Sequence, residues 1–210
     1  DDKLKDYIIN LTKGFSIKPV FLNIDTPNKG QADSALQALK QLNRNTNFSA
    51  LPVYISPCDS IITFEDSALS FLSKDPFGLV TSVNNPFARL HPDSYSYITT
   101  SFDNNEYKKV VTDIFVKALP SKDIQALKLF VTGAFYSSNL NIFTNTLEDK
   151  FKQLNTVNEE KYLDTFFQML VHDKKSNVAL TNAKLYDSIG TPNEYLAALY
   201  WDDFLSKFEY

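Results

Sequence analysis

Apolar side chains recur at every third or fourth position in several stretches of the chain, which is the spacing that places them on one face of an α-helix. The first of these stretches ends at Gly14, and glycine commonly follows the last turn of a helix. The pattern predicts helices over residues 1–14, 31–42, 67–73, 142–154, 159–171 and 193–210.

Short apolar or alternating runs between polar residues predict strands over residues 20–24, 51–55, 77–83, 96–102, 109–116, 127–135 and 177–185. A polar turn at residues 103–106 predicts that the fourth and fifth of these form a hairpin. The early order strand, helix, strand, with short links, is typical of a right-handed βαβ unit in a parallel sheet. The sequence therefore predicts one α/β domain over residues 1–210, with a mixed, mainly parallel sheet that is flanked by helices and carries a β-hairpin excursion.

The stretch LPVYISPCDSIITF, residues 51–64, carries the first candidate for chemistry. Asp59 follows an apolar strand and a tight turn, and open α/β sheets bind ligands at the carboxyl ends of their parallel strands. A carboxylate at that place suits Mg²⁺, which takes one or two carboxylates together with substrate phosphates. The alternative is that Asp59 only caps a turn or a helix start.

Composition narrows the classes of function. The chain has 43% hydrophobic residues and a net charge of −4, as ordinary globular proteins do. It shows no basic cluster that would track a nucleic acid backbone and no apolar run that would span a membrane, so neither partner is expected. Its single cysteine fits a reducing compartment, and we expect the cytoplasm. One cysteine and two distant histidines give no zinc site and no Cys–His pair.

Several further stretches of the sequence are informative because of the order in which they occur along the chain. They are TPNKGQADSALQALKQL from Thr26, ISPCDSII around Asp59, YKKVVTDIFVKALPSKD with LFVTGAFYSSNLNIF, EEKYLDTFFQMLV, and YDSIGTPNEYLAALYW. In this order, over nearly the whole chain, they resemble the sugar nucleotidyltransferases, which are nucleotide-diphospho-sugar pyrophosphorylases with a Rossmann-like, GT-A-like fold. The resemblance implies a nucleotide-diphospho-sugar transferase-like domain.

Three residues are candidates for catalysis. The resemblance implies that Asp59 and Asp164 are carboxylates that bind Mg²⁺, and that Lys117, at the end of a strand, neutralises a substrate phosphate as a compact point charge. Each has a simpler alternative. Asp164 could be an exposed residue that is favoured by the dipole at a helix start, and Lys117 could be a solvated loop lysine.

Five residues are candidates for substrate binding. The resemblance implies that Gly30, Gln31 and Ala32, at the start of a helix, hold the nucleobase, although a simple tight turn would also explain them. Gly133 interrupts an apolar strand, which suggests close approach of a ligand or of another backbone segment. Glu160 is a candidate partner for a sugar hydroxyl, and its alternative is a solvated helix face.

Three departures from the family pattern bear on activity. The family's opening glycine-rich loop, with its arginine and downstream lysine, is not found in this sequence, which has five glycines. We therefore expect a domain that is truncated at its N-terminus and inactive by itself. Val116 stands where the family has glutamate before its lysine, and Asn193 with Glu194 replaces Glu-Asp after Gly-Thr-Pro.

The predicted function is Mg²⁺-dependent transfer of a nucleotidyl group from a nucleoside triphosphate to a sugar 1-phosphate or similar phosphate, with release of pyrophosphate. The alternative is a non-catalytic regulatory or binding module of the same fold that has lost the phosphate loop. A GT-A glycosyltransferase is a weaker third interpretation, because residues 58–60 are not an Asp-x-Asp motif. The base, the sugar and the oligomeric state stay open, an oligomer included.

Overall fold

The computed structural model describes residues 2–14, 19–24, 29–44, 46–64, 75–83, 92–103, 108–118, 129–173 and 178–207. The helix predicted at residues 67–73 lies outside these ranges. The described helices are α1 (Asp2–Thr12), α2 (Gln31–Asn43), α5 (Leu140–Phe151), α6 (Leu163–His172) and α7 (Pro192–Ser206), with a short 3₁₀ turn at Pro92–Ser94. The described strands are β1 (Val53–Ile55), β2 (Ser60–Thr63), β3 (Phe77–Ser82), β4 (Tyr97–Asp103), β5 (Lys108–Phe115), β6 (Phe130–Ser137), β7 (Val178–Asn182) and β8 (Leu185–Ser188).

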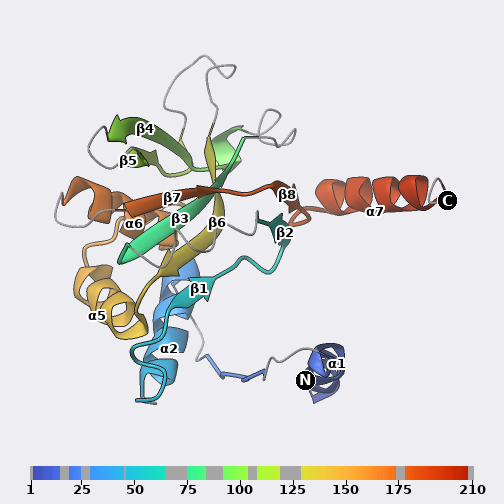
Figure 1. The fold of residues 1–210 in the computed structure, drawn as a ribbon, viewed down its shortest axis with the longest axis horizontal. Coiled ribbons are helices and arrows are strands. Elements are labelled where there is room, and N and C mark those ends of the chain that lie inside the picture. The colour runs from blue at the N-terminus through green and yellow to red at the C-terminus, as the bar shows by residue number, and fades with distance from the viewer. Residues whose placement is uncertain are drawn as a thin grey trace.

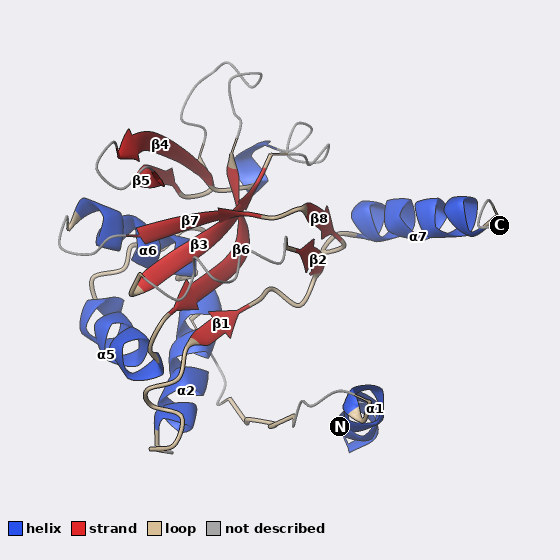
Figure 2. Cartoon of the chain, in the orientation of Figure 1, coloured by secondary structure: helices blue, strands red, loops and turns tan. Residues whose placement is uncertain are grey.

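A six-stranded sheet forms the centre of the molecule (Figure 1). Its strands follow the order β5-β4-β6-β3-β7, and β1 pairs with β6 outside this order, along Phe135–Ser137. The predicted α/β class is confirmed, because the sheet is mixed and helices flank it (Figure 2). The predicted hairpin is confirmed by the antiparallel pair β4–β5. Among the described strands only β3 and β7 pair in parallel, so the predicted predominance of parallel pairs is not seen in this part of the chain.

The predicted βαβ unit around α2 is wrong. Residues 19–24 form no strand and pair with none of the described strands, and Val20 is 59% exposed. The second strand of the supposed unit, β1, is only partly buried and runs antiparallel to β6 at the edge of the sheet. An apolar run shows that a strand is favoured, but it does not show which strand becomes its neighbour.

Two further element boundaries differ from the sequence pattern. The strand predicted over residues 177–185 is two strands, because β7 pairs with β3 whereas β8 leaves the large sheet and pairs with β2. The helix predicted from residue 159 begins at Leu163, since Asn158 and Glu159 adopt left-handed backbone angles with φ of 51° and 67°. The other predicted helices and strands that fall on described residues are found within a few positions.

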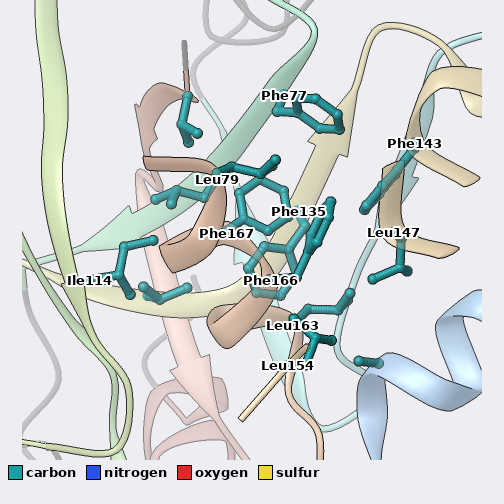
Figure 3. Close-up of a cluster of buried hydrophobic side chains, with 14 of the residues drawn as sticks. Phe77, Leu79, Ile114, Phe135, Phe143, Leu147, Leu154, Leu163, Phe166 and Phe167 are labelled. Carbon is teal, nitrogen blue, oxygen red and sulfur yellow. The ribbon is translucent and has the colours of Figure 1, made fainter. Parts of the chain in front are cut away.

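The main core lies between the sheet and helices α2, α5 and α6. Its centre is a group of phenylalanine rings from β3, β6, α5 and α6 (Figure 3). Phe135 and Phe167 stack with ring centroids 4.8 Å apart, and Phe143 stacks on Phe166 at 5.7 Å. Burial of large aromatic side chains is the largest favourable contribution that a side chain makes to a core. This layer holds α6 against the sheet.

The opposite face of the sheet carries a smaller cluster of Tyr97, Phe130 and Tyr186. Phe130 and Val131 are neighbours in β6 but pack in different clusters, as expected for side chains that alternate across a strand. The rings of Phe130 and Tyr186 meet edge to face at 5.3 Å, which joins β8 to the large sheet.

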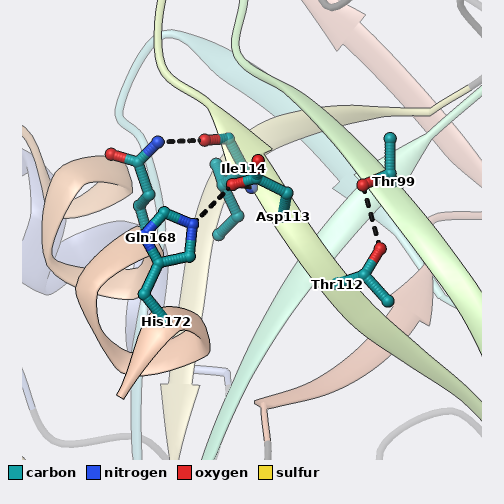
Figure 4. A network of polar contacts seen from close by, with 6 residues as sticks. All are labelled: Thr99, Thr112, Asp113, Ile114, Gln168 and His172. Carbon is teal, nitrogen blue, oxygen red and sulfur yellow. Dashed lines mark hydrogen bonds and ion pairs between the residues drawn. The ribbon is translucent and has the colours of Figure 1, made fainter. Parts of the chain in front are cut away.

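Helix α6 and strand β5 of the β4–β5 hairpin are joined by polar contacts (Figure 4). Gln168 Nε2 donates to the main-chain oxygen of Ile114, and His172 Nε2 lies 2.8 Å from Asp113 Oδ1. Thr99 and Thr112 are joined through their hydroxyls at 2.9 Å, across β4 and β5. The surface position predicted for His172 is confirmed, because its side chain is largely exposed; the other histidine, His91, lies outside the described residues.

Helix α7 projects away from the sheet (Figure 1). It begins with Pro192 after a capping box, in which Thr191 accepts from the main-chain nitrogen of Glu194 and the Glu194 carboxylate accepts from that of Thr191. Its large apolar side chains, Trp201 among them, are exposed. None of the helices in the described ranges is long and apolar enough to cross a membrane.

Candidate functional site

A cavity of about 540 Å³ opens where several helix starts and strand ends meet. Its walls come from the start of α2, the β1–β2 loop, the residues before β4 and after β5, the middle of β6, the start of α6, β8 and the start of α7. It is lined by Gln31, Pro57, Asp59, Ser94, Tyr95, Ser96, Lys117, Val131, Thr132, Gly133, Tyr162, Asp164, Tyr186, Ser188, Gly190, Thr191, Asn193 and Glu194. Five of the residues predicted from the sequence are among these: Gln31, Asp59, Lys117, Gly133 and Asp164.

Asp164 lies in the first turn of α6 and is 7% exposed. Its Oδ2 accepts a hydrogen bond of 2.6 Å from the Ser96 hydroxyl, whereas its Oδ1 is buried without a partner among the described residues. Burial raises the pKa of this carboxyl above its ordinary range, against the opposing effects of the Ser96 bond and the Lys117 charge. A buried oxygen without a partner costs about 1–3 kcal/mol, and a ligand with a positive charge or a donor would remove that cost.

Lys117 follows β5 and has a left-handed backbone, with φ of 48°. Its main-chain N–H donates to Ser96 Oγ at 3.2 Å. Its ammonium group donates to the main-chain oxygen of Ser94 and lies 5.6 Å from the ring centroid of Tyr162. The lysine therefore sits at the wall of the cavity, with its charge near Asp164.

Asp59 also lines the cavity and lies just before β2. Its main-chain oxygen accepts from Ile189, which ties the β1–β2 loop to the end of β8. The carboxylate is exposed and close to Gly190: a Cβ at that glycine would lie 2.7 Å from Asp59 Oδ2. A glycine at position 190 thus leaves the space that the Asp59 carboxylate occupies.

The predicted substrate-binding residues fall into two groups. Gln31 and Gly133 line the cavity, and Gln31 Oε1 accepts from the main chain of Leu163, which joins the starts of α2 and α6. Gly133 has φ of +80°, a conformation that favours glycine. Gly30, Ala32 and Glu160 do not line it.

Those three residues instead lie where α2 meets the loop before α6. Ala32 is fully buried in the core, and its main-chain N–H donates to the oxygen of Lys161. Gly30 has φ of +106° and packs so closely on this loop that a Cβ would lie 2.8 Å from the Lys161 nitrogen. Glu160 is exposed in the same loop. The small side chains at positions 30 and 32 are thereby explained by packing.

Sequence reasoning missed a polar wall on the α7 side of the cavity. Glu194 is 5% exposed, and its Oε1 accepts from the Tyr95 hydroxyl at 2.8 Å. Burial raises its pKa, but the hydrogen bonds from Tyr95, Ser188 and Thr191 outweigh this effect and leave the pKa below its ordinary value. Burial raises the pKa of Tyr186 to about 12, with Asp59 and Glu194 adding to the rise. The sequence signal for this wall was the Gly-Thr-Pro turn that precedes Glu194.

The cavity combines groups suited to a phosphorylated polar ligand. Lys117 offers a positive charge, the first turns of α6 and α7 border it, and hydroxyl groups line the wall beside Glu194. Within the described ranges no three His, Cys, Asp or Glu residues cluster as a metal site would require. A cation at Asp59 and Asp164 would therefore need oxygen ligands from a substrate, as Mg²⁺ commonly has.

Comparisons with known proteins concern the fold. Neither the protein-family models nor the curated proteins gave a match to this sequence. The solved nucleoside-diphosphate-sugar pyrophosphorylase from Vibrio cholerae RC9 is similar, with 14% identity, a TM-score of 0.64 and coverage of 93% of this chain and 75% of that chain. The inositol-1-phosphate CTP transferase from T. maritima has 18% identity, a TM-score of 0.59 and coverage of 91% and 67%, respectively. The UTP-bound UGPase from Acinetobacter baumannii has 14% identity, a TM-score of 0.60 and coverage of 95% and 66%.

The chain has a nucleotidyltransferase-like fold. The resemblance inferred from the sequence motifs is confirmed at this level. On the nucleotidyltransferase-like fold, segments from residue 31 to residue 194 converge on one cavity.

Proposed function

We propose that this chain is a nucleotidyltransferase-like domain whose cavity binds a nucleoside triphosphate and a sugar phosphate. The reaction would transfer the nucleotidyl group to the sugar phosphate and release pyrophosphate. The observation that carries the proposal is the convergence of Asp59, Asp164 and Lys117, from distant parts of the chain, on one cavity in this fold.

The metal that fits this site is Mg²⁺. The buried Oδ1 of Asp164, which has no partner among the described residues, is an oxygen of the kind that a hard cation takes, and Asp59 lines the same cavity. Mg²⁺ bound there would neutralise phosphate charge and align the phosphates for in-line attack.

The chain's own residues would supply the remaining functions. Lys117 would exchange its bond to the Ser94 oxygen for a phosphate oxygen, which needs only a rotation of its flexible side chain. The hydroxyl groups of Tyr95, Tyr186 and Ser188 would face the polar part of the sugar. In such transfers the protein contributes mostly positioning and electrostatic stabilisation.

The alternative is a binding module that recognises a nucleotide-sugar without catalysis. The observation in its favour is the sequence itself, in which no glycine-rich loop is found to hold a triphosphate. Both functions would use the same cavity, so binding alone does not separate them.

A pair of carboxylate variants tests the site. Calorimetry and thermal unfolding would be measured with Mg²⁺ and a panel of nucleotide-sugars, for the wild-type chain, Asp59→Asn and Asp187→Asn. Asp187 is the matched control, since it is an exposed β8 carboxylate that does not line the cavity. A ligand at 100 times its Kd adds about 2.7 kcal/mol, which is roughly 5–10 °C in Tm for a chain of this size.

We expect this shift in the wild-type chain and in Asp187→Asn, and its loss in Asp59→Asn. An equal shift in all three chains, or none with any ligand, would contradict the proposed site. Pyrophosphate release from a nucleoside triphosphate and a sugar 1-phosphate then separates the two functions. Release supports the transferase, and binding without release supports the binding module.

A further inference from the structure

One buried hydroxyl contacts two of the charged residues of the candidate site. Ser96 Oγ donates to Asp164 Oδ2 at 2.6 Å and accepts from the main-chain N–H of Lys117 at 3.2 Å. A serine hydroxyl has one donor and two acceptor positions, so both bonds form at the same time. The residues that it joins belong to α6 and to the turn after β5.

The main chain of Ser96 is itself fixed to the sheet. Its main-chain oxygen accepts a hydrogen bond from the main-chain N–H of Val131 at 2.8 Å. Two residues further on, in β4, the main-chain N–H of Ile98 donates to the oxygen of Leu129 at 3.2 Å. Ser96 is also 2% exposed, so water does not compete for its hydroxyl. The hydroxyl therefore has a defined place relative to β6, whose residues Val131, Thr132 and Gly133 line the cavity.

Each of the two bonds fixes a feature that the site needs. The bond to Oδ2 leaves Oδ1 as the carboxylate oxygen without a partner among the described residues, so it determines which oxygen Asp164 offers to a ligand. The bond from Lys117 holds a main chain with φ of 48°, an uncommon angle for a residue other than glycine.

We propose that Ser96 is a positioning residue that sets the Asp164 carboxylate and the Lys117 turn together. The inference deepens the proposed function and rests on it, because it assumes that Asp164 faces a cation and that Lys117 faces a phosphate. It assigns to one hydroxyl the coupling of the acidic and the basic part of the site.

The test uses two probes that need no turnover. Isothermal titration calorimetry would measure the affinity for Mg²⁺ alone, which tests the Asp164 carboxylate, and the affinity for inorganic pyrophosphate alone, which tests the Lys117 charge. Ser96→Ala removes the hydroxyl, Ser96→Cys replaces it with a slightly larger thiol that hydrogen-bonds weakly, and Ser96→Thr keeps the hydroxyl. Thr99→Ala is the control, since it removes a hydroxyl hydrogen bond three residues further along the chain, in the β4–β5 hairpin and away from the cavity (Figure 4).

We expect Ser96→Ala and Ser96→Cys to bind both probes roughly tenfold more weakly, as for the loss of a hydrogen bond to a charged group. Ser96→Thr and Thr99→Ala should bind both as the wild-type chain does. In the Asp164→Asn background, Ser96→Ala should cause no further loss of Mg²⁺ binding. In the Lys117→Met background it should cause no further loss of pyrophosphate binding. A purely structural role would lower affinity in these backgrounds as well.

Two results would overturn the inference, and they differ in what they imply. If Ser96→Ala and Ser96→Cys bind both probes normally while Asp164→Asn and Lys117→Met lose them, Ser96 does not position the site and the proposed function stands. If the wild-type chain binds neither probe, or binds both unchanged in Asp164→Asn and Lys117→Met, the proposed function fails together with the inference.

Discussion

The contact between Gly30 and the loop before α6 yields a quantitative prediction. An alanine at position 30 would keep a backbone with φ of +106°, and its Cβ would lie 2.8–2.9 Å from main-chain atoms of Lys161 and from the Glu160 side chain. For a residue other than glycine, this backbone conformation, with ψ of −171°, costs about 1–3 kcal/mol, and overpacking against a backbone that cannot rotate away costs about 1–3 kcal/mol more. We expect Gly30→Ala to lower the free energy of unfolding by roughly 2–6 kcal/mol, or about 5–20 °C in Tm.

Two other glycines provide a graded comparison. Gly133 has φ of +80°, but a Cβ there would meet only Pro57, at an ordinary 3.6 Å, so Gly133→Ala should cost the strain alone, about 1–2 kcal/mol. A Cβ at Gly14 would meet nothing within 4 Å, so Gly14→Ala should change stability by less than about 1 kcal/mol.

Urea unfolding, followed by far-ultraviolet circular dichroism, would give the three free energies. The expected order of destabilisation is Gly30→Ala, then Gly133→Ala, then Gly14→Ala. If Gly30→Ala were as stable as Gly14→Ala, the close packing of α2 on the loop before α6 would be refuted. If Gly30→Ala stayed stable but bound nucleotide-sugars much more weakly, the sequence-based role in substrate binding would be favoured over packing.

Three further predictions concern the cavity. Burial raises the pKa of Asp164 above 3.8, so the folded chain loses stability as the pH rises past that value. Asp164→Asn removes this loss. In urea unfolding, the free energy of unfolding of Asp164→Asn relative to the wild-type chain should therefore increase from acidic pH toward pH 7. Gly190→Ala places a Cβ 2.7 Å from Asp59 Oδ2, so the carboxylate must move. Calorimetry should show Mg²⁺-dependent nucleotide-sugar binding that is weaker by about tenfold or more, while the free energy of unfolding changes by less than about 1 kcal/mol. Hydrogen bonds hold the pKa of Glu194 below 4.5 despite its burial, so Glu194→Gln should cost about 1–2 kcal/mol at pH 7, and that cost should vanish as the pH falls through the folded pKa.

Much of the fold follows from local patterns. The fully apolar run of β3, the alternation in β4 and β5, and the helical spacing in α2, α5 and α6 each specify an element, because each requires one face or two faces to be buried. Local patterns do not determine which strand pairs with which. Val20 and Ile24 belong to a run as apolar as a buried strand, yet residues 19–24 pair with no described strand.

The split between β7 and β8 has the same cause. Ala183 donates to the oxygen of Thr81, and Lys184 donates to that of Thr63, so successive residues join different sheets. No glycine or proline marks this change, because both residues keep ordinary backbone conformations while their partners differ. The information lies in distant segments.

The residues of the candidate site also differ in whether a local sequence pattern reveals them. The residues found from sequence stand in motifs with a local logic, such as a carboxylate after a strand or a polar residue at a helix start. Ser96 and Tyr95 lie in an ordinary polar stretch before β4, and their role depends on Asp164 and Glu194, which follow much later in the chain. Such contacts between distant residues leave no periodic signal.

The scattered origin of the cavity walls has a consequence for folding kinetics. Gln31 meets Leu163 across 132 positions, and Ser96 meets Asp164 across 68. Contacts of such long range form late, since the chain must close large loops before they stabilise it. We expect the complete cavity to be unformed in the folding transition state, so a ligand that fills it should slow unfolding while leaving the refolding rate nearly unchanged. The occupancy of the cavity would then control how long a folded molecule lasts, and would have little influence on how fast it forms.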